Sequence, residues 1–296
     1  MADRRTSDSL GFIGLGVMGG AMCANLAAGH KGPVLAFDRD SGRLQAAVEA
    51  GAVAARSVDA VGAQAGIVFL VLPGEAEVRD VCLGKYGLCS GARPGQLIVD
   101  CSTVPVALSR ELAVAAAARG AAFADAPIAG TWQQAPAREI SLLLGAEAAV
   151  FARLRPHLRR MARHVMRCGD VGSGITVKLL LNMVLAESVV ALAEALALAR
   201  RSGVEGEVLF EALGRGCDSF ALHQHGMTAL LPDTFPEGRF PTRYMLKDLD
   251  YLVRHADGLG LSMPGLEVAR ALLRASAAAG NADAYWPAFI RVLENR

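Results

Sequence analysis

The chain has 296 residues, enough for about two domains at roughly 150 residues each. Its composition is 53% hydrophobic and 20% charged, which excludes intrinsic disorder, because disordered chains are poor in apolar residues and carry a large net charge. The formal net charge is +1, from 30 basic and 29 acidic residues. This balance argues against a dedicated nucleic-acid binder. We therefore expect a globular protein that acts on small molecules.

Two apolar stretches raise the question of a membrane span or an export signal. The stretch Ile175–Ala199 is interrupted by two glutamates, a lysine and an asparagine. A spanning helix needs about 18 nearly uncharged apolar residues, so we expect a helix buried in protein and no membrane contact. The stretch Leu10–Gly29 lacks a clear cleavage site for export. The six cysteines form no CxxC pair, and we expect a cytoplasmic protein without disulfides or metal.

The first 170 residues alternate short apolar runs with alanine-rich runs. The predicted strands are Gly11–Gly14, Val34–Asp38, Ile67–Leu72, Leu97–Asp100, Ala122–Ala126, Ile140–Leu144 and Val165–Cys168. The early helices between them are predicted at Gly19–Ala28, Gly42–Ala50 and Val106–Arg119. Alternation of nearly continuous apolar strands with helices predicts a parallel, doubly wound sheet covered on both faces, an α/β domain of the Rossmann type.

After Gly172 the pattern becomes helical throughout. Residues 173–202 predict one long helix, and no strand is predicted beyond it. The shorter helices are predicted at Glu205–Leu213, Ser219–Leu230, Thr242–Leu259, Gly265–Ala279 and Ala284–Leu293. We therefore expect an α/β domain over 1–170 and an all-helical domain for substrate binding and dimerisation over 171–296, joined by the long helix. That helix also suggests packing against a second subunit, in a homodimer or homotetramer.

The strongest local motif is Gly14-Leu15-Gly16-Val17-Met18-Gly19, between a predicted strand and a predicted helix. In a dinucleotide site, the first glycine allows the tight turn and the second lets the backbone approach a pyrophosphate. The third permits close packing of helix and strand. The N–H groups at the helix N-terminus then bind the phosphates.

The choice of dinucleotide depends on the end of the second predicted strand. Asp38 lies 19 residues after Gly19, near the spacing expected of the acid that binds the ribose. A carboxylate there accepts a hydrogen bond from the 2′-hydroxyl and repels a 2′-phosphate, which favours NAD. Arg39 follows directly and could hold a 2′-phosphate, so NADP remains an alternative.

Five motifs in order resemble the β-hydroxyacid dehydrogenase family, which includes 3-hydroxyisobutyrate dehydrogenases and 2-hydroxy-3-oxopropionate reductases. The motifs are Phe12–Gly19, Asp100–Thr103, Asp125–Gly130, Gly172–Gly174 leading to Lys178 and Asn182, and Lys247-Asp248. The resemblance covers essentially the whole chain. It implies hydride transfer between NAD(P) and a small 3-hydroxy acid or its semialdehyde.

The resemblance also implies roles for single residues. Cofactor contacts beyond the glycine motif, Asp38 and Arg39 would come from Leu72, Pro73, Glu77, Thr103 and Lys247. Many relatives carry Asn at the position of Glu77. The substrate would contact Ala129, Gly130, Thr131, Lys178, Asn182, Phe240 and Lys247. Lys178 would be the catalytic proton donor and acceptor, with Asn182 as its catalytic neighbour.

The residues themselves support a catalytic Lys178. Lys178 and Asn182 are four residues apart, so they share one face of the predicted helix. A bare lysine on an apolar face is costly unless it lines a cleft or is paired. Burial would lower its pKa and suit it to proton transfer near neutral pH, while the cofactor carries the hydride. The structural alternative is that Lys178 extends to solvent from the helix start.

The segment Ala129-Gly130-Thr131 departs from the Ser-Gly-Gly that holds the substrate carboxylate in many relatives. Thr131 could supply a replacement hydroxyl, and Trp132 could narrow the acyl pocket or simply pack. An imine reductase on the same fold is one alternative, although those enzymes typically carry Asp or Tyr at the position of Lys178. A non-catalytic NAD(P)-binding interaction protein is another. The combination of Lys178, Asn182 and Lys247 favours the dehydrogenase.

Overall fold

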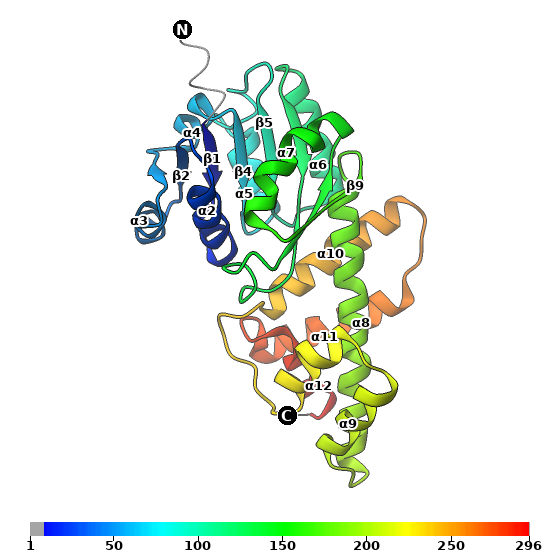
Figure 1. Ribbon diagram of the computed structural model, residues 1–296. Helices are drawn as coiled ribbons and strands as arrows, with labels where there is room; N and C mark the ends of the chain where they lie inside the picture. Colours follow the sequence, from blue (N-terminus) through cyan, green and yellow to red (C-terminus); the bar gives the residue numbers. More distant parts are fainter. Residues whose placement is uncertain (1–8, 296) are drawn as a thin grey trace. The chain divides into compact units, whose positions relative to one another are not determined.

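The computed structural model describes residues 9–295, and the chain divides into two compact units, Met1–Lys178 and Leu179–Arg296. The division falls inside the long helix α8 (Ser173–Arg201), which is green in Figure 1. The first turns of α8 therefore belong to the α/β unit, and the rest of the helix belongs to the helical unit.

The first unit is built on one sheet whose parallel strands lie in the order β3-β2-β1-β4-β5-β6. This is the strand order of a doubly wound Rossmann sheet, and the predicted fold class is confirmed. The strands are β1 (Leu10–Ile13), β2 (Val34–Phe37), β3 (Val53–Ala54), β4 (Ile67–Leu70), β5 (Leu97–Asp100) and β6 (Ala122–Asp125). Strand β3 was not predicted, because two exposed residues show no apolar run.

Beyond β6 the sheet is no longer purely parallel, and here the sequence prediction was wrong. Strand β8 (Ser141–Gly145) runs antiparallel to β6 and to the short β7 (Ile128–Ala129), and β9 (His164–Gly169) pairs in parallel with β8. A parallel return needs a crossover connection, usually a helix. Residues 126–140 form none, so β8 enters the sheet in the opposite direction.

Helices cover both faces of this sheet (Figure 1). They are α2 (Val17–Gly29), α3 (Ser41–Glu49), α4 (Val58–Gln64), α5 (Glu75–Leu83), α6 (Val106–Ala117) and α7 (Ala148–Met161). Successive strand residues point to opposite faces, so Phe12 packs in the cluster with Met22 of α2 and Leu154 of α7. Its neighbour Ile13 packs in the other cluster, with residues of α4, α5 and α6.

The second unit is helical, as predicted, and within the described residues its only β contact is the isolated bridge between Pro241 and Tyr285. After α8 come α9 (Gly206–Gly216), the π-helix η1 (Leu222–Leu230), α10 (Thr242–Gly258), α11 (Pro264–Ser276), the π-turn η2 (Ala277–Asn281), the 3-10 turn η3 (Trp286–Phe289) and α12 (Ile290–Leu293). The last predicted helix is shorter than expected because Pro287 lacks an N–H and fits only in a first helical turn.

Helix α8 is long and strongly apolar. Its most apolar 18 residues have a mean hydropathy of 1.9, so by length and composition it could cross a membrane, and the prediction that no stretch meets this test was wrong. Core helices of globular proteins pass the same test. In α8, a third of that window is buried within the protein, and the buried Asn182 is hydrogen-bonded to Asp248.

A buried histidine lies in the core of the helical unit. His225 of η1 is 5% exposed, its Nδ1 lies 2.6 Å from the Tyr285 hydroxyl, and its ring packs edge-on against Trp286. Burial lowers the pKa of His225 to about 4 and raises the pKa of Tyr285 to about 12. Both side chains are therefore neutral at pH 7, as their buried positions require.

Acid should destabilise the helical unit through His225. Between its ordinary pKa of 6.5 and its folded pKa of about 4, the folded state binds fewer protons than the unfolded chain, so stability falls as the pH drops through this window. The loss by pH 4 is about 3 kcal/mol. Urea unfolding at several pH values, followed by Trp286 fluorescence in a Trp132→Phe background, measures it.

Replacement of His225 by Phe should remove this contribution from the pH dependence, even though the variant loses the Tyr285 hydrogen bond. The exposed His223, two residues earlier, provides the matched control variant His223→Phe. An unchanged pH dependence in His225→Phe would show that this histidine is not the group responsible.

Candidate functional site

The glycine motif forms the turn between β1 and α2. Gly14 has φ +90°, and a Cβ there would collide with the Val71 carbonyl oxygen. A Cβ on Gly19 would collide with the carbonyl oxygen of Gly14. By contrast, the nearest atom to a Cβ on Gly16 would be 4.0 Å away, at Arg43. The first and third glycines are thus required by the turn itself, whereas the second borders open space.

The N-terminus of α2 is suited to bind an anion. Gly16 is the residue before the helix, and as a glycine it has no side chain that could accept hydrogen bonds from the first N–H groups. The first N–H groups of any helix lack partners within the helix, and they carry the positive end of its dipole. Val17 and Met18 stand in this first turn. Open space beside Gly16 and these N–H groups together fit the pyrophosphate of a dinucleotide.

Asp38 lies directly beside this turn. One carboxylate oxygen accepts a hydrogen bond from the Leu15 N–H at 2.6 Å, and the other accepts one from the Asp40 N–H at 2.8 Å. These bonds tie the end of β2 to the glycine turn. A carboxylate has about four acceptor positions, so Asp38 retains capacity for ribose hydroxyls. Arg39 is exposed next to it.

The loops after β4 and β5 are joined by hydrogen bonds. The Leu72 N–H donates to the Ser102 hydroxyl at 2.9 Å, and the Ser102 N–H donates to Asp100 at 2.9 Å. Ser102 and Asp100 are buried, while Leu72 and Thr103 are half-buried. From β1, the strands β2 and β3 are added on one side of the sheet and β4 to β6 on the other. Ligands of doubly wound sheets bind at this switch in strand order, between β1 and β4.

The remaining cofactor candidates on this side follow β4. Pro73 is exposed in the loop, and the half-buried Glu77 lies in the first turn of α5.

Ser102 is a residue to which the sequence prediction assigned no role, quoting it only as part of a motif. Its hydroxyl nevertheless sets the position of Leu72, a contact between residues 30 positions apart.

Ala129, Gly130 and Thr131 lie where β7 ends and a loop begins. Gly130 has φ +138°, a conformation that favours glycine. The Thr131 N–H donates to the Gln134 side-chain oxygen at 2.8 Å. Trp132 is 45% exposed, so it fills no core position in the α/β unit.

The start of α8 is held by a buried carboxylate. Asp125, at the end of β6, is 2% exposed and accepts hydrogen bonds from the N–H groups of Gly172 and Ile175, each at 2.7 Å. Burial raises the pKa of Asp125 to about 6, while the backbone hydrogen bonds act to lower it. Lys178 is half-buried and follows Ile175 by three residues. Asp125 therefore fixes the helical turn that leads to Lys178.

In the helical unit, a second buried carboxylate connects two predicted site residues. Asp248 of α10 is buried and accepts a hydrogen bond from the Asn182 side chain at 2.8 Å. The Lys247 ammonium lies 3.2 Å from the other oxygen of Asp248, and it also lies over the Tyr244 and Tyr251 rings. Asn182 and Lys247 are thus brought together by Asp248.

The sequence prediction quoted Asp248 only as part of a motif. The signal that could have identified it is its position among the apolar residues of α10. Met245, Leu249 and Leu252 are buried on the same helix, and a carboxylate in such a stripe requires a partner. Phe240, just before α10, is 38% exposed and packs against the Tyr244 ring.

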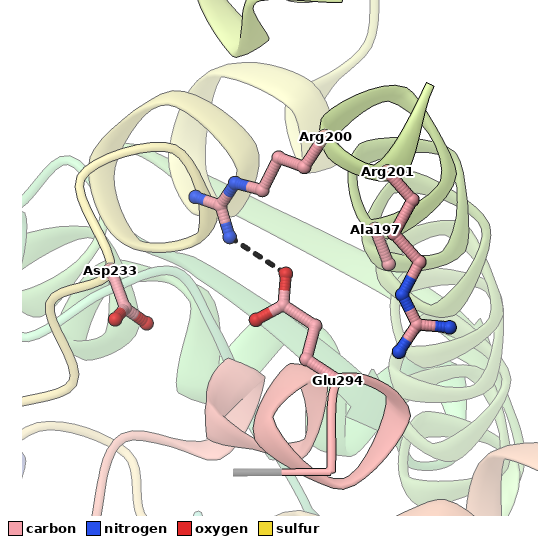
Figure 2. A pocket seen from close by; sticks show the side chains of 5 residues that line it. All are labelled: Ala197, Arg200, Arg201, Asp233 and Glu294. Carbon is pink, nitrogen blue, oxygen red and sulfur yellow. Dashed lines mark hydrogen bonds and ion pairs between the residues drawn. The ribbon is translucent and has the colours of Figure 1, made fainter. Parts of the chain in front are cut away.

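A cavity of about 390 Å³ lies elsewhere in the helical unit and contains none of the predicted site residues. It is lined by Ala197, Arg200, Arg201, Asp233 and Glu294 (Figure 2). Arg200 forms an ion pair with Glu294 at 2.8 Å and also donates to the carbonyl groups of Leu230 and Leu231. These contacts fasten the end of α8 to Glu294 and to the end of η1, and they give Arg200 a structural role.

The described residues contain no group of three or more His, Cys, Asp or Glu side chains that could hold a metal ion. In the first unit the candidate groups are the backbone N–H groups of the glycine turn, which can bind a phosphate, and Lys178, whose side chain can move a proton. In the second unit they are Asn182 and Lys247 with the buried Asp248 between them.

Comparison with known proteins agrees with this geometry. The protein-family model described as the NAD binding domain of 6-phosphogluconate dehydrogenase matches residues 9–169. A second protein-family model, described as NAD-binding of NADP-dependent 3-hydroxyisobutyrate dehydrogenase, matches residues 172–293. Together these matches span nearly the whole described chain.

Individual relatives are similar over most of their length. A 3-hydroxyisobutyrate dehydrogenase of Pseudomonas aeruginosa is 35% identical, covering 89% of this chain and 90% of its own. A 2-hydroxy-3-oxopropionate reductase of Escherichia coli is 30% identical, with 96% and 97% covered. The structure of Mycobacterium tuberculosis 3-hydroxyisobutyrate dehydrogenase with L-serine is 31% identical, with a TM-score of 0.86 and coverage of 97% and 99%.

Imine reductases are more distant. The enzyme of Myxococcus stipitatus, solved with NADP+, is 20% identical with a TM-score of 0.64, covering 96% of this chain and 99% of its own, which is a likeness of fold alone. The family models match both units, residues 9–169 and 172–293. This chain belongs to the β-hydroxyacid dehydrogenase family of NAD(P)-dependent oxidoreductases.

Proposed function

We propose that this protein transfers a hydride between a nicotinamide dinucleotide and a small 3-hydroxy acid or its semialdehyde, as the names of the 3-hydroxyisobutyrate dehydrogenase and 2-hydroxy-3-oxopropionate reductase relatives suggest. The observation that carries the proposal is the anchoring of α8 by Asp125. Its carboxylate accepts the N–H of Ile175, which lies three residues before Lys178. A lysine at a fixed, half-buried helix position can act as a general acid and base.

In this proposal Lys178 moves the proton that accompanies hydride transfer. During reduction its ammonium donates a proton to the aldehyde oxygen, and during oxidation the neutral amine accepts the proton of the hydroxyl group. The bound dinucleotide supplies or receives the hydride. Lysine suits this role because its ammonium can donate a proton and its neutral amine can accept one.

Asn182 and Lys247 would bind and orient the substrate. The Asn182 amide donates to Asp248, so its carbonyl oxygen remains as an acceptor of fixed orientation. Lys247 supplies a positive charge for the carboxylate of a hydroxy acid, and Phe240 an apolar surface beside it. Asp248 acts through both as a positioning residue, because it holds them without itself needing to touch the substrate.

We further propose NAD as the preferred cofactor. The Asp38 carboxylate lies against the glycine turn, where it would accept hydrogen bonds from ribose hydroxyls and repel a 2′-phosphate. Arg39 carries the opposite charge but is exposed beside it. The proposed setting is the cytoplasm, and the proposed assembly is a homodimer or homotetramer, in which Leu180, Leu181 and Val184 of α8, exposed in the single chain, would be covered.

Lys178→Ala should lower kcat for semialdehyde reduction by about 10²- to 10⁴-fold, the usual contribution of a general acid or base. Turnover of a panel of semialdehydes, glyoxylate and cyclic imines with NADH and NADPH measures this. The exposed Lys85 gives the control variant Lys85→Ala. Imine turnover without aldehyde turnover would move the protein to the imine reductases, and NADH binding without any turnover would favour a non-catalytic role.

Asp38→Asn should weaken the preference for NADH over NADPH by roughly tenfold, because it removes the charge that repels a 2′-phosphate while keeping an oxygen for the Leu15 N–H. The ratio of kcat/KM for the two cofactors is the measurement. Asp40→Asn is the matched control, since Asp40 is exposed two residues away and caps α3. A wild-type preference for NADPH would refute the proposed NAD selectivity.

Gly16→Ala should fold normally and bind the dinucleotide at least about tenfold more weakly, because a Cβ there meets only open space in the protein but would obstruct the pyrophosphate. Titration of NADH fluorescence measures the Kd, and circular dichroism checks the fold. Gly214→Ala in α9, also in open space, is the control. Unchanged NADH affinity in Gly16→Ala would place the pyrophosphate elsewhere.

A further inference from the structure

The loop after β7 is folded tightly around one side chain. At Gly130 a Cβ would lie 2.9 Å from the Ile140 side chain and 3.1 Å from the Gln134 side-chain oxygen. The first distance is shorter than real Cβ contacts allow, and φ is +138°. Only glycine therefore fits at this position, and its backbone lies directly against the carboxamide of Gln134.

The carboxamide oxygen of Gln134 takes up both donors of Thr131. It accepts the Thr131 N–H at 2.8 Å and the Thr131 hydroxyl at 3.3 Å. Thr131 is the residue that the sequence offered as a replacement for the missing serine hydroxyl. The Thr131 hydroxyl already donates to Gln134. We therefore look for another donor to the carboxylate of a substrate.

These contacts orient the other end of the planar amide. With Oε1 held against Thr131, the two protons of Nε2 point away from it, and none of the described residues provides Nε2 with a hydrogen-bond acceptor. Gln134 is half-buried, whereas its neighbour Gln133 is exposed. A half-buried pair of N–H donors without an acceptor is suited to receive one from a ligand.

The loop that carries Gln134 is fixed to the cofactor-binding helix. The Gln134 carbonyl accepts the Glu139 N–H at 2.9 Å, and the Gln134 N–H donates to the Thr131 carbonyl at 3.1 Å. The next residue, Ala135, is fully buried, and its carbonyl accepts a hydrogen bond from Asn25 of α2 at 3.0 Å. Gln134 is thus tied to the same helix that begins at the glycine turn.

We propose that Gln134 is a specificity-determining residue, whose Nε2 donates to the carboxylate of the substrate in place of the serine hydroxyl of many relatives. This inference rests on the proposed function and names the residue that would read the acid end. A carboxamide offers two protons to one carboxylate and carries no charge of its own. It therefore favours an anionic acceptor over a cationic group at this end of the substrate.

Gln134→Glu tests the proposal with the smallest change of shape. The carboxylate keeps one oxygen for the Thr131 donors, but it replaces the two N–H donors with a second oxygen and a negative charge. We expect kcat/KM for malonic semialdehyde, the carboxylate-bearing aldehyde of a 3-hydroxy acid, to fall at least about tenfold, equivalent to about 1.4 kcal/mol. For propanal, an uncharged aldehyde of the same length, kcat/KM should stay within about twofold.

Gln133→Glu is the matched control, because it introduces the same charge at the adjacent exposed position and should leave both substrates unaffected. Equal losses on both aldehydes in Gln134→Glu, or no loss on either, would overturn the proposal, since a merely structural contact has no reason to distinguish substrate charge. If the wild-type protein reduces no semialdehyde, the proposed function itself fails, and this inference fails with it.

Discussion

The buried contact between Asp125 and the first turn of α8 is the constraint on which the site depends. It joins the end of a central strand to the helix that carries Lys178, across 50 residues of sequence. Hydrogen bonds to a charged group contribute about 1.5–3 kcal/mol each. Burial works against them, as the pKa of about 6 shows. The close approach requires glycine at 145 and 174, where a Cβ would collide with Asp125 or with the Leu143 carbonyl.

In the helical unit, too, a buried carboxylate holds predicted site residues in place. Asp248 is buried in the apolar stripe of α10, and its two oxygens are shared between Asn182 and Lys247. Buried polar groups in native proteins almost always have partners, because an unsatisfied one costs about 1–3 kcal/mol. Each unit therefore holds candidate site residues in place through one buried carboxylate.

The parts of the site differ in how closely they follow the family. The glycine turn and the start of α8 lie in motifs through which the sequence resembles the family, and binding of a dinucleotide requires such a glycine turn. The loop at Ala129–Gln134 departs from the family pattern, because Ala129 stands where many relatives carry serine and the nearby Thr131 hydroxyl donates to Gln134. This is the expected place for divergence, since loops carry specificity while the scaffold holds the reaction.

Local pattern determined much of this protein. Short apolar runs predicted most of the parallel strands. The glycine motif predicted a dinucleotide turn, and the spacing from Gly19 to Asp38 predicted an acid beside it, where Asp38 accepts the Leu15 N–H. The reversed direction of β8 was decided by tertiary structure, because strand direction depends on the connection and not on the strand's own residues. The partnership of Asn182 with Asp248 joins residues 66 positions apart, and such a contact leaves no trace in local periodicity. It exists only once the helices pack.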